Sequence, residues 1–96
     1  MKNNKNSKKE AQTRHAKQRA MERYEIDFTQ FKRETMLKQI DRGEGKFVRK
    51  QSYRVSIFSM ICDGKEVIVV YDKERNNIAS FLPLEAKDKD IFMGNL

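Results

Sequence analysis

The sequence is poor in the residue types that build disulfides, zinc sites and paired-imidazole catalysis. Its 96 residues include one cysteine, Cys62, and one histidine, His15. A single cysteine excludes an internal disulfide framework and a cysteine-rich zinc site. A single histidine excludes any mechanism that needs two imidazoles from one chain. We expect no metal and no cofactor. We interpret Cys62 as a buried thiol rather than a reactive one.

Long apolar runs are also missing. The longest, Val67 to Tyr71, is far too short to cross a bilayer. Residues 1–6 are polar and lack the apolar stretch of a secretory signal, so we expect a cytoplasmic protein with no membrane partner. Apolar residues make up 38% of the chain and charged residues 36%, which at this length predicts one small domain.

Positive charge is concentrated in the first half of the chain. Residues 1–50 carry 15 basic and 7 acidic side chains, whereas residues 51–96 carry 6 basic and 7 acidic ones. A positive potential of this kind attracts polyanions, and RNA is the partner that we expect. The alternative is a basic surface that has no partner.

The first half of the chain predicts a helix after a basic arm. Residues 1–8 are too polar to bury apolar area, so we expect them to form a flexible arm. Residues 9–24 are rich in helix formers and contain no glycine or proline, with Ser7 and Glu10 placed as a capping box. The stripe of this helix that we expect to face the core consists of Ala16, Ala20 and Tyr24.

A second helix is expected from Asp27 to Gly43. Asp27 fits the N-cap with Gln30 three residues later, and Ile26 and Phe31 occupy the positions of a hydrophobic staple. Gly43 is placed to end the helix. The apolar stripe of this helix is Phe28, Phe31, Met36, Leu37 and Ile40.

The second half of the chain predicts four strands. Asp63-Gly64 is typical of a tight hairpin, Pro83 ends the last strand, and residues 85–96 form a polar tail. The second strand has apolar residues on both faces, so we expect it to be central. The predicted strands are Phe47–Lys50, Tyr53–Ile61, Glu66–Tyr71 and Ile78–Leu82.

The order of these elements predicts an α+β fold over residues 9–84. Two N-terminal helices would pack on one face of a four-stranded antiparallel sheet. That arrangement leaves the other face of the sheet partly open, and such a face is a common place for a functional site.

One helical segment has the residues for phosphate chemistry. His15 and Arg19 are four residues apart, so their side chains lie on one side of a helix, and Arg23 follows one turn later. Imidazole can move a proton near neutral pH, and guanidinium groups match the oxygens of a phosphate. The alternative is an ordinary solvated face, on which Glu22 pairs with Arg19 and His15 has no role.

Two stretches of the chain resemble a known family. They are His15-Ala16-x-x-Arg19-x-x-Glu22-Arg23-Tyr24, and Val67-Ile68-Val69-Val70-Tyr71-Asp72 followed by Asn77-Ile78-Ala79-Ser80-Phe81-Leu82-Pro83. They are similar to small bacterial and phage domains that are grouped with the RelE-like and colicin D-like ribonucleases, which include barnase and the EndoU-type enzymes. The resemblance covers about residues 14–83. It implies a RelE-like, metal-independent ribonuclease fold.

The resemblance also implies catalytic residues, namely His15, Arg19, Arg23 and the hydroxyl of the last strand. That hydroxyl belongs to Ser80 here, where the family often has threonine. The implied reaction is transesterification, in which the RNA 2′-hydroxyl attacks the neighbouring phosphate. Glu22 is the nearest second proton carrier, but pairing with Arg19 would keep its pKa low and make it a poor acid.

Several further residues are candidates for substrate binding. A basic residue and a phenol on the sheet, Arg54 and Tyr71, can hold a phosphate or stack on a base. Lys46, Arg49 and Lys50 add positive charge near the first strand, although charge also protects an edge strand from aggregation.

The sequence thus predicts a toxin-like endoribonuclease whose partners are RNA and an acidic antitoxin or immunity protein. Two alternatives remain open at this point. One is a nucleic-acid-binding accessory protein, for example of a phage, that does not cleave nucleic acid. The other is a protein-interaction module that inhibits another enzyme. A shared fold does not decide between these functions.

Overall fold

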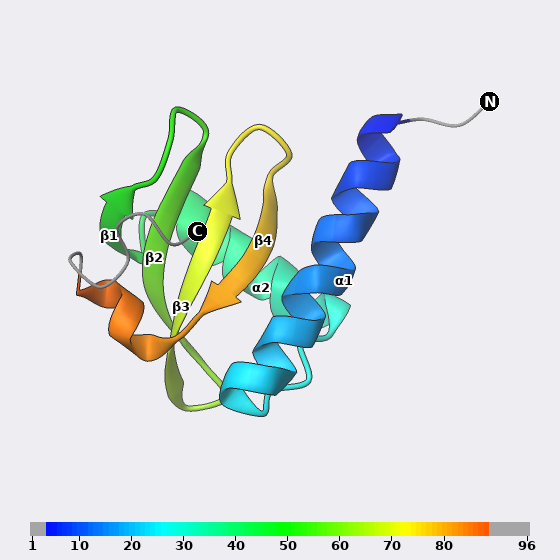
Figure 1. Ribbon diagram of the computed structural model, residues 1–96. Helices are drawn as coiled ribbons and strands as arrows, with labels where there is room; N and C mark the ends of the chain where they lie inside the picture. The colour runs from blue at the N-terminus through cyan, green and yellow to red at the C-terminus, as the bar shows by residue number, and fades with distance from the viewer. Residues whose placement is uncertain (1–3, 89–96) are drawn as a thin grey trace.

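The computed structural model describes residues 4–88 and has two helices followed by four strands. The strands lie side by side in chain order, and every neighbouring pair is antiparallel (Figure 1). The predicted α+β class is therefore confirmed. The elements are α1 (Asn4–Tyr24), α2 (Gln30–Asp41), β1 (Lys46–Lys50), β2 (Val55–Cys62), β3 (Lys65–Asp72), β4 (Asn77–Leu82) and a short 3-10 helix, η1 (Leu84–Lys87).

The buried side of α1 is the predicted one. Ala16 and Ala20 are fully buried, and their small side chains allow the helix to pack closely against β4. Tyr24 ends the stripe, and its hydroxyl donates to the Leu82 carbonyl at 2.5 Å and accepts from the Ile68 amide at 3.2 Å. This one side chain therefore ties the end of α1 to both β3 and β4.

The start of α1 differs from the prediction. The helix begins at Asn4 rather than at Lys9, so residues 4–8 of the predicted arm are helical, and Ser7 lies inside the helix instead of capping it. No glycine or proline interrupts residues 4–8, and a helix extends readily from a packed segment. Residues 1–3 of the predicted arm lie outside the described residues.

The start of α2 also differs. The N-cap is Thr29, whose hydroxyl accepts from the Lys32 amide at 3.2 Å, and the predicted N-cap Asp27 is wrong. The predicted staple is wrong as well, because Phe31 is 77% exposed. Phe28, just before the helix, is buried instead. Burying that ring moves the helix start two residues along the chain, which turns Phe31 outward.

The hairpins of the sheet have clear local causes. Asp63 and Gly64 both adopt positive φ, at 54° and 76°, as a two-residue turn between twisted strands requires. The predicted strand at Tyr53 is wrong, because the amides of Gln51 and Ser52 both donate to the Val55 carbonyl and reverse the chain. Tyr53 therefore lies at the tip of a loop, and the other strand ends differ from the prediction by at most one residue.

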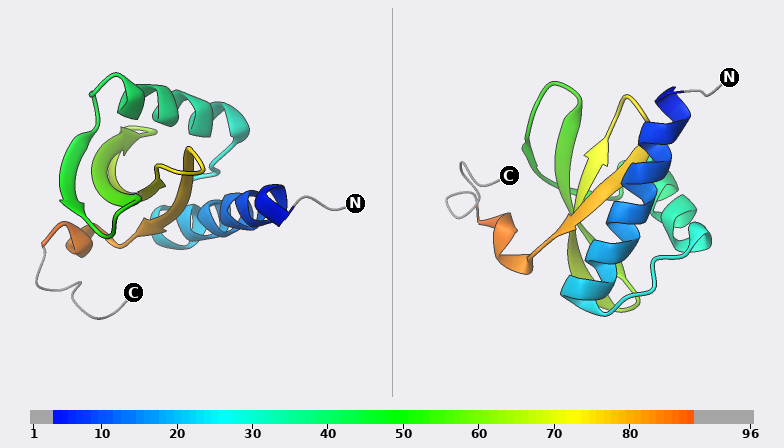
Figure 2. Two further views of the ribbon diagram at one scale, coloured as in Figure 1. Left: turned by 90° about the horizontal axis from the view of Figure 1, so that it is seen from above. Right: turned by 45° about the vertical axis from the view of Figure 1, so that its right-hand side comes forward.

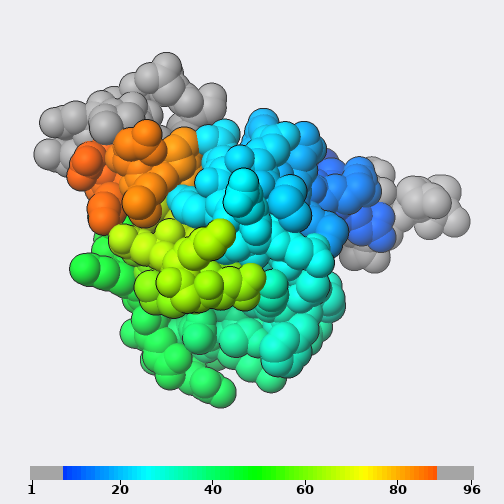
Figure 3. Space-filling model, turned by 90° about the horizontal axis from the view of Figure 1, so that it is seen from below, coloured from blue at the N-terminus to red at the C-terminus, as the bar shows by residue number. Residues whose placement is uncertain are grey.

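Both helices share one core on one face of the sheet. Ala16 and Ala20 from α1 and Met36 from α2 pack with Met60 of β2 and Val69 of β3. Figure 2 shows the curved sheet with α2 across this face and α1 alongside β4. From below, the hairpin between β2 and β3 lies between η1 and the segment that leads into α2 (Figure 3).

The opposite face of the sheet is much less covered, and we call it the open face. The 3-10 helix η1 packs on it through Ala86. The predicted tail therefore begins with a short helix, and its residues 89–96 lie outside the described residues. No helix within residues 4–88 has the length and apolarity to span a membrane. The open face carries Ile57, Ile68, Val70, Ser80 and Leu82.

Candidate functional site

The two flanks of α1 face different parts of the molecule. On one flank, Lys17 forms a 2.7 Å ion pair with Asp27, in the segment that leads into α2. A helix turns about 100° per residue, so His15, Arg19 and Arg23 lie on the other flank. We call these three side chains the basic flank of α1.

The basic flank borders the open face of the sheet. Gln12 belongs to the same side of α1, and its amide donates to the Asp72 carboxylate at 2.9 Å. Asp72 ends β3 two residues after Val70, so both side chains point to the open face. The contact between Gln12 and Asp72 therefore orients the basic flank toward β4 and the open face.

The basic flank is accessible to a ligand. The His15 side chain is exposed and makes no hydrogen bond or ion pair with residues 8–88, and the Arg23 side chain is exposed without a hydrogen bond in the same range. Arg19 is 33% exposed and donates to Glu22 at 2.6 Å, which is the pairing that the sequence predicts. The imidazole and one guanidinium group are therefore available, whereas the other guanidinium group is held.

Glu22 is poorly suited to donate a proton. Its carboxylate accepts hydrogen bonds from Gln18 at 2.9 Å and from Arg19 at 2.6 Å. The Gln18 hydrogen bond, followed by that of Arg19, lowers the pKa of Glu22 below its ordinary value. Glu22 is therefore ionised at neutral pH, as the sequence also indicates.

Ser80 presents a weakly held hydroxyl on the open face. It pairs with Val70 across β3 and β4, and it is half-buried. Within the described residues its hydroxyl makes one long hydrogen bond, 3.5 Å to the Phe81 carbonyl. The register shifts beside Ser80, which leaves Ala79 as the extra residue of a β-bulge. This hydroxyl can therefore exchange its partner for a ligand oxygen.

The structure does not bring Tyr71 together with Ser80. The Tyr71 ring lies on the face that the helices cover, with its centroid 6.0 Å from that of Phe58. Its hydroxyl donates to the Asn76 side chain at 3.1 Å. Burial raises the pKa of Tyr71, so the phenol stays protonated. Tyr71 therefore cannot share a phosphate with Ser80 on the open face.

Arg54 and Arg49 have structural partners. Arg54 donates to Glu74 at 3.0 Å and lies 3.6 Å from Asp72. Arg49 donates to the Ala86 carbonyl at 2.7 Å and so holds η1 against the sheet. The remaining two predicted binding residues, Lys46 and Lys50, are exposed at the two ends of β1.

A buried polar cluster fixes the position of α1, and the sequence did not reveal it. Asp72 is almost fully buried and accepts from Gln12, from the Arg75 guanidinium at 3.0 Å, and from the backbone amides of Glu74 and Arg75. Asn77, also buried, donates to the Lys9 carbonyl at 3.4 Å. The one local signal was an aspartate at the start of a polar turn.

The described residues contain no cluster of metal ligands and no exposed thiol. Within the described part of the chain, no three histidine, cysteine or acidic side chains lie close enough to hold a metal ion. Cys62 is buried, and burial raises the pKa of its thiol, which lowers its reactivity. A surface hollow of about 470 Å³ lies beside Gln39 and Glu44, and the basic flank does not line it.

The chain matches no protein-family model, no curated protein and no solved structure. The resemblance to the RelE-like and colicin D-like ribonucleases therefore stays a prediction that depends on the quoted residues alone.

Proposed function

We propose that the protein binds RNA beside its open face and cleaves it by transesterification without a metal ion. The observation that carries this proposal is the orientation of α1. One flank of the helix presents His15, Arg19 and Arg23, and that flank borders the sheet face to which Ser80 belongs. A proton carrier, two guanidinium groups and a hydroxyl are the groups that phosphodiester cleavage needs.

In the proposed reaction the 2′-oxygen attacks the phosphorus and the bond to the 5′-oxygen breaks. The products are a 2′,3′-cyclic phosphate and a free 5′-hydroxyl. Arg23 and Arg19 stabilise the charge on the non-bridging oxygens, and Ser80 donates a hydrogen bond to the phosphate. His15 serves one of the two proton transfers. Where His15 takes the proton of the 2′-hydroxyl, solvent gives the proton to the leaving 5′-oxygen, because Glu22 is held ionised and has no proton to give.

The test compares two variants of exposed residues on opposite flanks of α1. His15→Ala removes the imidazole, and Arg14→Ala removes a full charge from the other flank. Each protein is incubated with total RNA or transfer RNA in EDTA, and folding is checked by circular dichroism. Cleavage should be lost in His15→Ala and kept in Arg14→Ala. Equal cleavage by both variants would remove His15 from the mechanism.

A second function, nucleic-acid binding without cleavage, is favoured by the surroundings of His15. Catalytic imidazoles are commonly oriented by a hydrogen bond to their second nitrogen, and His15 has no such bond within residues 8–88. A protein of this kind would bind RNA with a steep dependence on salt, and His15→Ala would change little. An acidic antitoxin or immunity protein would compete with RNA for the same basic flank.

A further inference from the structure

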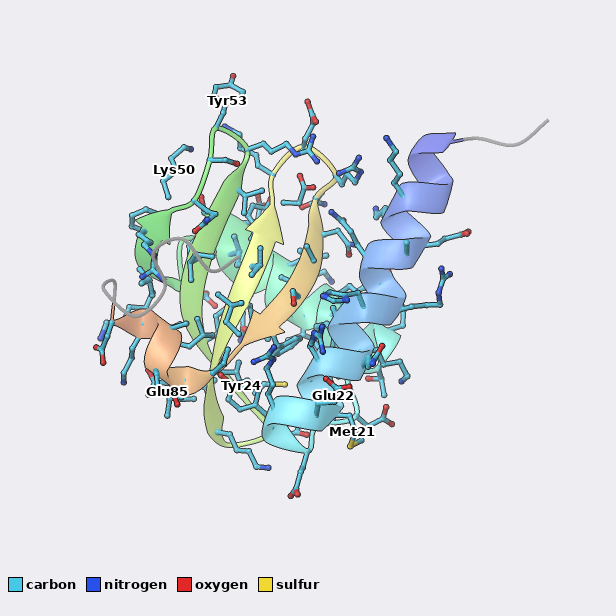
Figure 4. All side chains as sticks on the ribbon, in the orientation of Figure 1. Met21, Glu22, Tyr24, Lys50, Tyr53 and Glu85 are labelled. Atoms are coloured by element: carbon cyan, nitrogen blue, oxygen red, sulfur yellow. The ribbon has the colours of Figure 1, made fainter. Side chains whose placement is uncertain are left out.

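The loop between β1 and β2 displays an aromatic ring at one end of the sheet. Tyr53 is 83% exposed, more than any other large apolar side chain of the described residues. Figure 4 shows Tyr53 and Lys50 at the same end of the molecule, with Tyr53 at the tip of the loop. A ring so exposed contributes little to the core, and its position calls for another explanation.

The backbone around this ring is held in place. Gln51 and Ser52 donate to the Val55 carbonyl at 2.8 and 3.1 Å, and Val55 donates back to Ser52 at 3.3 Å. The Lys73 amide donates to the Arg54 carbonyl at 2.8 Å, which joins the loop to the neighbouring turn. The entropic cost of ordering the loop when a ligand binds at Tyr53 is therefore small.

Two lysines lie at the same end of the molecule as the ring (Figure 4). The Lys73 ammonium group lies 5.3 Å from the Tyr53 centroid, and Lys50 is exposed at the end of β1. The nearby carboxylate of Glu74 is already paired with Arg54 at 3.0 Å. Neither lysine is paired with a carboxylate of the described residues, and a base can stack on the ring face opposite the one that Lys73 covers.

We propose that Tyr53 is a stacking platform for an unpaired base of single-stranded RNA, with Lys50 and Lys73 contacting the adjacent phosphates. The proposal rests on the proposed function for the identity of its ligand, and it adds that the ligand is single-stranded. Bases in a duplex are stacked on one another and do not offer their faces to a protein ring. An exposed aromatic ring flanked by cations is the arrangement that single-strand binding uses.

The platform is within reach of Ser80 on the open face. Tyr53 lies four residues before Ile57, which is at most about 14 Å along the chain. Ile57 pairs with Val70, and Val70 pairs with Ser80, which adds about 10 Å across two strand spacings. A strand of a few nucleotides can therefore stack on Tyr53 while its next phosphates lie over the open face.

The experiment measures affinity separately from cleavage. Fluorescence anisotropy follows binding of a labelled oligouridine of about eight nucleotides with 2′-O-methyl groups, which no transesterification can cut. A 2′-O-methyl duplex of the same length is the second ligand. The protein variants are Tyr53→Phe, which keeps the ring, Tyr53→Leu, which keeps apolar bulk, and Tyr53→Ala. A second pair, Lys73→Gln and Lys38→Gln, compares a charge beside the ring with an exposed charge on α2.

Tyr53→Ala and Tyr53→Leu should weaken binding of the single strand by about fivefold or more, and Tyr53→Phe should leave it nearly unchanged. Duplex affinity should be the same for all three variants. Lys73→Gln should weaken single-strand binding more than Lys38→Gln. Thermal unfolding checks each variant, and the exposed position of Tyr53 predicts little change in its midpoint.

Equal affinity of wild type and Tyr53→Ala for the oligouridine would overturn the platform, and so would the absence of any binding by the wild type. Full affinity in Tyr53→Leu would show that apolar bulk rather than ring stacking holds the RNA, and it would overturn the platform as well. Cleavage of unmodified RNA is measured alongside. If the wild type cuts no RNA but depends on Tyr53 for binding, the catalytic proposal fails and the platform stands. If it cuts RNA without such dependence, the platform alone fails.

Discussion

Replacing Asp72 by asparagine should weaken the attachment of α1 to the sheet. The Asp72 carboxylate is almost fully buried and accepts hydrogen bonds from Gln12, from the Arg75 guanidinium and from two backbone amides. Burial alone would raise the pKa of Asp72, but the hydrogen bonds from Gln12 and Arg75 outweigh burial, and the net pKa lies below its ordinary value. The carboxylate is therefore charged at neutral pH.

The expected cost follows from what asparagine cannot do. It keeps the shape and one oxygen, but it turns an amide group toward its donors, and the side chain of Arg75, only 15% exposed, loses its counter-charge. Losing charge-assisted hydrogen bonds in a buried site costs about 2–4 kcal/mol of the free energy of unfolding. The Arg54 guanidinium lies 3.6 Å from the Asp72 carboxylate and is 40% exposed, so it adds little to this cost. The urea midpoint at pH 7 should fall by about 1–2 M.

The pH dependence gives a sharper test. The pKa of Asp72 is lower in the folded protein than in the unfolded chain, where it is near 3.9. The carboxylate therefore stabilises the folded protein fully above the unfolded pKa, and this stabilisation is lost as the pH falls through the folded pKa. The difference in the free energy of unfolding between wild type and Asp72→Asn should therefore be constant between about pH 5 and 7 and shrink below about pH 4. A difference as large at pH 3 as at pH 7, or none at pH 7, would refute the reasoning. Asp63→Asn, an exposed control whose side chain pairs with Lys32, should cost less than about 1 kcal/mol.

Three further variants test other contacts. Tyr24→Phe leaves two backbone groups of the sheet without their partner and should lower the free energy of unfolding by about 1–3 kcal/mol, measured by urea denaturation. Glu22→Gln removes a negative charge and releases Arg19, so RNA affinity at low salt should rise about two- to fivefold in an anisotropy titration. Arg23→Gln should reduce the slope of log affinity against log salt by about 0.7 for a single strand, whereas Lys38→Gln should leave that slope unchanged.

Much of the fold could be predicted because its causes are local. The stripe of Ala16, Ala20 and Tyr24 follows from helical spacing, and each of these side chains contacts the core or the strand backbone as expected. Asp63-Gly64 accepts positive φ without strain, so the hairpin follows from two residues. These features need no knowledge of distant parts of the chain.

The features that were missed depend on distant contacts. Asp27 and Thr29 are both good N-cap residues, and burial of Phe28 in the core decides between them. Strict alternation would place Ile78 and Ser80 on one face of the sheet. The bulge between them puts Ile78 into the helix-side core and leaves Ser80 on the open face.

The candidate site could be predicted only in part, for the same reason. Helical spacing groups His15 with Arg19, but spacing cannot show which way that flank turns. The contact between Gln12 and Asp72 decides it, over 60 residues of sequence. The alternating pattern of residues 53–61 predicted a strand that begins at Tyr53, so it gave no sign that Tyr53 lies exposed in a turn.

Cleavage of RNA in EDTA tests the central claim most directly, that the basic flank and the open face form a ribonuclease site. The substrate is an RNA oligonucleotide, with a DNA of the same sequence as the control that lacks the attacking hydroxyl. We predict that the folded wild-type protein cuts the RNA to 2′,3′-cyclic phosphate ends and leaves the DNA intact, and that His15→Ala abolishes this activity. Intact RNA after incubation with folded wild-type protein, or equal cutting of the DNA, would contradict it.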